Sequence, residues 1–162
     1  MEQKEISIQE ALPILKEMLN ISGLTNLMGK SVSWFAGKEV DREVSFIDFC
    51  GFTDENIELI NKSINHIADE CESHLLDLPT DNINRKEYNE YVSRELKEVR
   101  KSISFVYLRE KYTTIGEQTF SRKLRLAPNR NNVFQFTTSD IVQINAGLKA
   151  ISEQLRSMKI IL

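Results

Sequence analysis

The chain has 162 residues, a net charge of −3, and 41% apolar and 28% charged residues. A chain of this length and composition folds as one domain or two small ones and is not expected to be disordered. It has no basic-then-apolar leader after Met1 and no apolar run near the roughly 20 residues of a membrane helix, which predicts a cytoplasmic protein without a membrane partner.

The charge is distributed unevenly along the chain. Residues 1–80 contain 6 Lys and Arg against 15 Asp and Glu, a net charge of −9, whereas residues 81–162 contain 15 against 9, a net charge of +6. Such an asymmetry points to one half that binds a polyanion and another half with a different task.

The first half opens with a predicted helix over about residues 8–19, and a second helical stretch ends early at Gly37. Because this half is acidic and repels DNA at long range, we interpret the outward side of the second stretch as a surface for dimerisation or a protein partner. A weaker DNA contact is the alternative. The residues expected on this surface are Lys30, Ser31, Ser33, Trp34 and Lys38.

Residues 44–50 form a β-prone run that we interpret as an extended plug in the core, with one arm of a hairpin as the alternative. In the helix predicted next, over about residues 53–74, His66, Glu70 and His74 recur at a spacing that can hold a metal. No fourth ligand is evident, so we expect no metal site. Cys50 and Cys71 predict free thiols rather than a disulfide.

An internal repeat links the two halves. Residues 52–67 and 136–151 share the pattern F-T-x-x-[N/D]-I-x-x-I-N-x-x-[I/L]-x-x-I at a constant offset of 84. Thr53 and Thr137 suit helix N-caps, and the Phe before each cap and the Ile after it form a hydrophobic staple. Asn56 and Asp140 replace the usual Glu or Gln, which predicts an imperfect capping box. Upstream, residues 26–36 match residues 114–124 at an offset of 88, which predicts a four-residue indel.

The second half contains a predicted linker over residues 77–85, a long helix from Lys86 to about Tyr112 broken near Ser102, and a helix that begins near Glu117. In that last helix Phe120 and Leu124 lie four apart and are expected to pack inward. The residues expected outward are Gln118, Thr119, Ser121, Arg122, Lys123 and Arg125.

This outward side suits a DNA major groove. Arg can bond guanine and Gln can bond adenine through two hydrogen bonds each, so we assign Gln118, Thr119 and Arg122 to bases. The phosphate contacts are assigned to Lys123, Arg125 and Arg130. A solvated basic helix face is the alternative interpretation.

Residues 108–124 resemble the helix-turn-helix of phage-repressor-type DNA-binding proteins. The match lies in an apolar residue followed by a helix of the form polar-polar-Thr-apolar-Ser-Arg, at Ile115 and at residues 117–122. The turn departs from the family, because it has one extra residue and carries Thr113 and Thr114 where a Gly is usual. The resemblance implies two tandem helix-turn-helix-like units, the first more diverged than the second.

After that helix, the turn-forming residues 128–132 precede a β-prone run over residues 133–136. One interpretation is a small hairpin, a wing that carries Arg130 toward the DNA backbone. The other is an extended apolar segment that fills the helical core.

The sequence as a whole therefore predicts a mainly α fold with short hairpin or extended segments. Unit 1 is expected over residues 1–76 and unit 2 over residues 86–162. Known catalytic motifs are missing from the sequence, so we expect neither an enzyme nor a cofactor. The expected function is duplex DNA binding, as a transcriptional or mobile-element regulator. The alternative is a helical protein-interaction or assembly module that keeps the fold without binding DNA.

Overall fold

The computed structural model describes residues 3–39, 51–130 and 132–162. Residues 44–50, including Cys50, lie outside this part, so the predictions made for them stay open. The described residues form eight helices: α1 (Ile8–Met18), α2 (Ile21–Leu27), α3 (Val32–Lys38), α4 (Asp54–Ser73), α5 (Arg85–Val99), α6 (Phe105–Tyr112), α7 (Glu117–Leu124) and α8 (Thr138–Ser157).

Four short strands complete the described part. Strand β1 (Lys4–Ser7) pairs in parallel with β4 (Met158–Ile161), and β2 (Pro128–Asn129) pairs antiparallel with β3 (Asn132–Val133). The mainly α fold class is thus confirmed, as are the short hairpin in the second half and the break that separates α5 from α6. None of the described helices is both long enough and apolar enough to cross a membrane.

The N-termini of α4 and α8 are capped identically. The side-chain oxygens of Thr53 and Thr137 accept the N–H groups of Asn56 and Asp140, at 3.3 and 3.2 Å. In return, the side-chain oxygens of Asn56 and Asp140 accept the N–H groups of the two threonines, at 3.1 and 2.7 Å. The imperfect capping box expected from the sequence is therefore wrong, because the shorter Asn and Asp side chains still reach the cap N–H.

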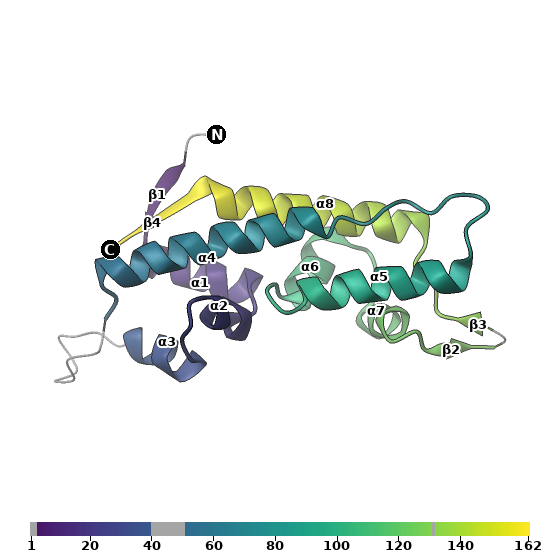
Figure 1. Cartoon of the computed structure of the whole chain (residues 1–162), viewed down its shortest axis with the longest axis horizontal. Coiled ribbons are helices and arrows are strands. Elements are labelled where there is room, and N and C mark those ends of the chain that lie inside the picture. The colour runs from purple at the N-terminus through teal and green to yellow at the C-terminus, as the bar shows by residue number, and fades with distance from the viewer. Residues whose placement is uncertain (1–2, 40–50, 131) are drawn as a thin grey trace.

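Helices α4 and α8 have 20 residues each and run antiparallel along one side of the molecule, overlapping in their C-terminal halves (Figure 1). The C-terminal parts of the two stripes that the repeat pattern predicted meet there, and both stripes are buried along their length. A single cluster of buried apolar side chains extends from this pair through all the other helices. The fully buried residues of the two stripes are Ile60, Ile64, Ile67, Ile141, Ile144, Leu148 and Ile151.

The asparagine that both copies of the repeat contain links each helix to the segment that follows the other. After α8, the backbone of Ile160 lies beside Asn61, which donates through Nδ2 to its carbonyl (2.8 Å) and accepts its N–H through Oδ1 (2.9 Å). After α4, the backbone of Leu76 makes the same two bonds with Asn145, at 2.8 Å each. Leu76 and Ile160 are themselves 84 positions apart. The asparagine of each copy therefore binds the equivalent residue in the segment that follows the long helix of the other copy.

A second set of contacts shows the same internal two-fold relation. Leu19 and Ile103, which are also 84 positions apart, form an antiparallel bridge with each other. The N–H of Asn20 donates to the Ser102 carbonyl and the N–H of Ser104 donates to the Met18 carbonyl, both at 2.9 Å. The two halves therefore face each other as the subunits of a symmetric dimer would, within one chain.

The upstream alignment at an offset of 88 is wrong. It pairs Val32, which is 48% exposed at the start of α3, with Phe120, which is 5% exposed in the middle of α7. An offset of 85 instead pairs Phe120 with the buried Phe35. It also aligns the turn between α2 and α3 with the turn between α6 and α7, each of which is four residues long. The difference arises because similar residue types recur along both segments, and only burial distinguishes Phe35 from Val32 as the equivalent of Phe120.

The two halves differ in the structure of their first residues. In the first half β1 lies beside β4 as a strand, whereas the corresponding residues of the second half belong to α5. There the hydroxyl of Tyr88 donates to the Asp77 carbonyl (2.7 Å), and the Tyr91 hydroxyl accepts the Asp77 N–H (3.1 Å). Side chains thus replace a strand in holding the segment between α4 and α5.

We predict that Asn61→Ala and Asn145→Ala each lower the free energy of unfolding by about 1–3 kcal/mol, because each leaves a backbone N–H and carbonyl without partners at a buried position. Urea unfolding measures this. Asn26→Ala, at an exposed position of α2, serves as the control and should change stability little. Losses below about 0.5 kcal/mol for both test variants would contradict the clamping role of the two asparagines.

Candidate nucleic-acid interface

Helix α7 is fixed to the core along one side. The Phe120 ring meets the rings of Phe105 and Phe136 edge to face, at centroid distances of 5.6 and 6.2 Å. At the end of the helix the Ser93 hydroxyl donates to the buried carbonyl of Leu124 (2.6 Å). The inward packing predicted for Phe120 and Leu124 is confirmed, and it leaves the opposite side of α7 to solvent.

Lys123 departs from the expected outward orientation. Its side chain is only 11% exposed and forms an ion pair with Asp140, whose side chain is equally buried. Because Asp140 also caps α8 through Thr137, this pair ties the end of α7 to the start of α8. The expectation that Lys123 projects outward is wrong, since its position on the helix borders the core rather than the solvent face.

The other five predicted residues of α7 are exposed and form what we call the α7 face: Gln118, Thr119, Ser121, Arg122 and Arg125. Four of them, with Glu117, line an open depression of about 450 Å³. The Arg122 guanidinium lies 5.3 Å from the centroid of the Phe134 ring, which restrains the side chain by a cation–π contact. The face therefore presents hydrogen-bonding groups and two guanidinium groups on a rigid support.

The chain leaves α7 through a strained turn into the β2–β3 hairpin. Leu126 adopts a left-handed conformation (φ 56°), and the Ala127 N–H donates to the Arg122 carbonyl at 2.9 Å, which closes the helix end. Arg130, also left-handed, is exposed at the tip of the hairpin. The expected hairpin is thus present, and contact of Arg130 with DNA stays a prediction. Part of the alternative also holds, because Phe136 beyond the hairpin is fully buried.

The corresponding α3 face consists of Lys30, Ser31, Ser33 and Trp34, and Lys38 is the fifth residue that was expected there. The Trp34 ring has the ammonium groups of Lys30 and Lys38 at 5.2 and 5.6 Å from its centroid. Ser31 caps α3 by accepting the Trp34 N–H at 3.1 Å. Lys38 is only 9% exposed, so the outward orientation expected for it is wrong for the same reason as for Lys123, which is its match at an offset of 85.

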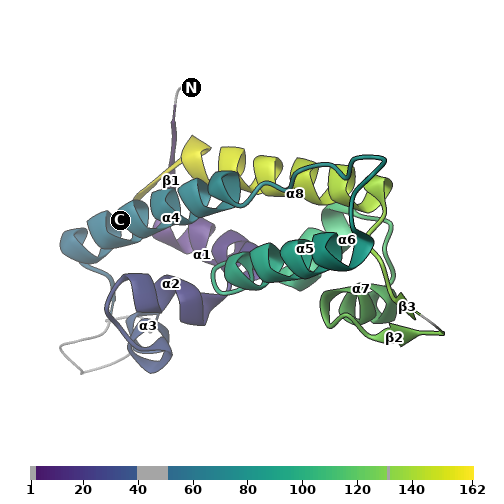
Figure 2. The ribbon, with the colours of Figure 1, turned by 45° about the vertical axis from the view of Figure 1, so that its right-hand side comes forward.

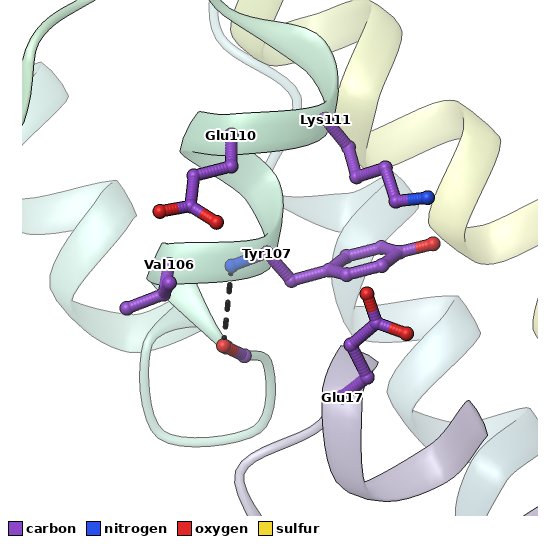
Figure 3. Close-up of a pocket in the computed structure, with 6 residues that line it drawn as sticks. Glu17, Val106, Tyr107, Glu110 and Lys111 are labelled. Carbon is purple, nitrogen blue, oxygen red and sulfur yellow. Dashed lines mark hydrogen bonds between the residues drawn. The ribbon is translucent and has the colours of Figure 1, made fainter. Parts of the chain in front are cut away.

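Other clusters in the described residues do not resemble a reactive centre. A cavity of about 250 Å³ lies between α1 and α6, where Glu17 and Lys111 flank the Tyr107 ring (Figure 3). The hydrogen bond within it, from the Tyr107 N–H to the Ser104 hydroxyl oxygen (3.3 Å), is the N-cap of α6. Its lining therefore serves helix capping and packing.

The histidines are directed to separate partners. His66 lies 3.6 Å from Glu70, whereas His74 bonds Glu95 at 2.7 Å and Glu70 accepts the Ser102 hydroxyl at 2.6 Å. Within the described ranges no three His, Cys, Asp or Glu residues gather as metal ligands would.

Two polar residues that position α7 were missed by the sequence analysis. Asn89 and Ser93 are buried on α5, one turn apart, and their side-chain oxygens bond the backbone of Phe136 and of Leu124. The signal in the sequence that could have revealed them is their spacing, because it places both polar residues on the apolar stripe of α5.

Comparison of the chain with family models, curated proteins and solved structures finds no match.

We predict that Lys123→Met and Asp140→Asn each lower the free energy of unfolding by about 3 kcal/mol, because each leaves a buried charge without its partner. The double variant, which restores a neutral site and keeps the net charge at −3, should recover most of that loss. Urea unfolding of the four proteins gives the coupling. Additive losses would contradict the pairing.

Proposed function

We propose that this protein binds duplex DNA through the α7 face and the Arg130 hairpin. The observation that carries the proposal is the division of α7 into a buried apolar side and an exposed side with Gln118, Arg122 and Arg125. Such a helix can enter a major groove, where Arg and Gln recognise bases. The hairpin beside it extends the cationic surface to where a phosphate backbone would pass.

The helices around this face support a helix-turn-helix unit in each half. Helices α6 and α7 are joined by four residues, and so are α2 and α3. In the first half the turn contains Gly29 in a left-handed conformation (φ 65°), where glycine is favoured because it lacks a Cβ. In the second half the turn is held differently, with the Thr114 N–H donating to Gln143 of α8 at 2.7 Å.

Regulation of transcription or of a mobile element is the role we assign to such binding. A protein-interaction module is the second candidate, and exposed apolar side chains beside the α3 face favour it. The side chains of Leu27 and Val32 are 39% and 48% exposed, and neighbouring exposed apolar side chains are typical of surfaces that bind other proteins. Loss of DNA binding in favour of a partner would leave the fold unchanged, because fold alone does not determine function.

We predict that the chain binds random duplex DNA at about 50 mM salt and that log K falls linearly with log salt, by about 0.9 per phosphate contact. Replacing Arg122, Arg125 and Arg130 together by Ala should weaken binding and reduce that slope by about 2–3. The matched control replaces Lys4, Lys62 and Lys149, which are exposed on β1, α4 and α8, and changes the net charge equally. Equal effects of both triple variants, or absence of binding, would refute the proposal.

A finer prediction concerns base recognition. Arg122→Ala should reduce the preference for a selected duplex by about 1–3 kcal/mol at a single base position, because one bidentate contact is lost. Competition binding with a set of single-base variants measures it. Arg125→Ala is the comparison, since loss of a phosphate contact should weaken all sequences alike. An unchanged preference profile for Arg122→Ala would assign that residue to the backbone instead.

A further inference from the structure

The internal two-fold relation determines where the α3 face and the α7 face lie relative to each other. The bonds of Asn61 and Asn145 and the Leu19–Ile103 bridge relate the two halves by one approximate axis. Helices α3 and α7 occupy matching positions in those halves. Figures 1 and 2 show both helices at the same edge of the molecule, at opposite ends, with the α4–α8 pair along the other edge.

This arrangement is the one that dimeric DNA-binding proteins use. Two recognition helices related by a two-fold axis meet successive turns on one side of a duplex, because the backbone of B-DNA has its own two-fold axes. Here a single chain supplies both helices. We propose that the chain binds one duplex at two half-sites, with α7 reading bases in one and α3 holding the backbone of the other. The proposal rests on the DNA binding proposed above.

The α3 face has few groups that could read bases. At the positions that match Gln118 and Arg122 it carries Ser33 and Gly37. It retains the Lys30 ammonium, beside the half-buried Trp34, and the exposed hydroxyl groups of Ser31 and Ser33. Lysine and serine side chains are typical phosphate contacts. The α3 half-site is therefore held without strong sequence preference.

Several described carboxylates of the first half lie away from this face or are paired. Three of its carboxylates, Asp69, Glu70 and Glu72, lie in the last turns of α4, the end of that helix that Figure 1 shows away from α3. Glu39, which follows α3, forms an ion pair with Lys16. These four carboxylates are therefore displaced from the α3 face or compensated beside it.

The test is a hydroxyl-radical footprint of the full chain on a duplex selected from a random pool. We expect two protected stretches on one side of the duplex, with centres about 10 bp or a multiple of it apart. Base changes should weaken binding at least about tenfold in one stretch and by less than about twofold in the other. Protection of a single stretch would overturn the two-site inference while leaving DNA binding by α7 intact.

Charge reversal separates the two helices. Lys30→Glu, at an exposed position, should remove protection at the sequence-tolerant stretch and weaken binding about tenfold at low salt, with base preference at the other stretch unchanged. Lys149→Glu on α8 is the matched control and should keep both stretches. An unchanged footprint and affinity for Lys30→Glu would assign the α3 face to a protein partner. Absence of DNA binding by the unmodified chain would instead refute the proposed function itself.

Discussion

The packing of the C-terminal halves of α4 and α8 is the contact on which the rest of the structure depends. It buries Ile and Leu side chains from the stripe of each helix. Each such side chain contributes on the order of 1.5–3 kcal/mol when it is removed from water. Asn61 and Asn145 add directional contacts to this packing, because each satisfies both backbone groups of one buried residue on the segment that follows the other helix. These four hydrogen bonds act on the register of the pair together with the bonds from Ser152 and Arg156 to Glu72.

Joining two copies in one chain allows equivalent positions to diverge in a complementary way. Glu72 and Arg156 occupy matching positions of α4 and α8, and they bond each other at 3.1 Å. The Arg156 guanidinium and the Ser152 hydroxyl hold the pKa of the Glu72 carboxyl below its usual range. A homodimer would place two like residues there. The contrast between the two exposed guanidinium groups of the α7 face and the single exposed ammonium group of the α3 face, that of Lys30, is divergence of the same kind at the opposite edge of the molecule.

Much of the helical framework could be predicted from the sequence. Periodicity located the paired helices within one or two residues, and Thr53 and Thr137 marked their starts correctly because capping is a local interaction. Packing of Phe120 and Leu124 followed from their spacing. The orientations of Lys38 and Lys123 could not be predicted, because a long side chain at the border of a helix face turns toward whichever partner the neighbouring elements provide. For Lys123 that partner is Asp140, from a helix that begins 15 residues after Lys123.

The sequence by itself determined that the chain is mainly helical, that its halves repeat, and that one helix of the second half has an apolar side and a cationic side. These properties depend on residue spacing within a single helix. Only the tertiary structure decided that the repeated helices pair with each other, that the repeated asparagine clamps the opposite copy, and that α3 and α7 lie at one edge of the molecule. Those outcomes depend on contacts between residues about 70 to 100 positions apart, which no local pattern encodes. The repeat was visible in the sequence, but its two-fold symmetry was not.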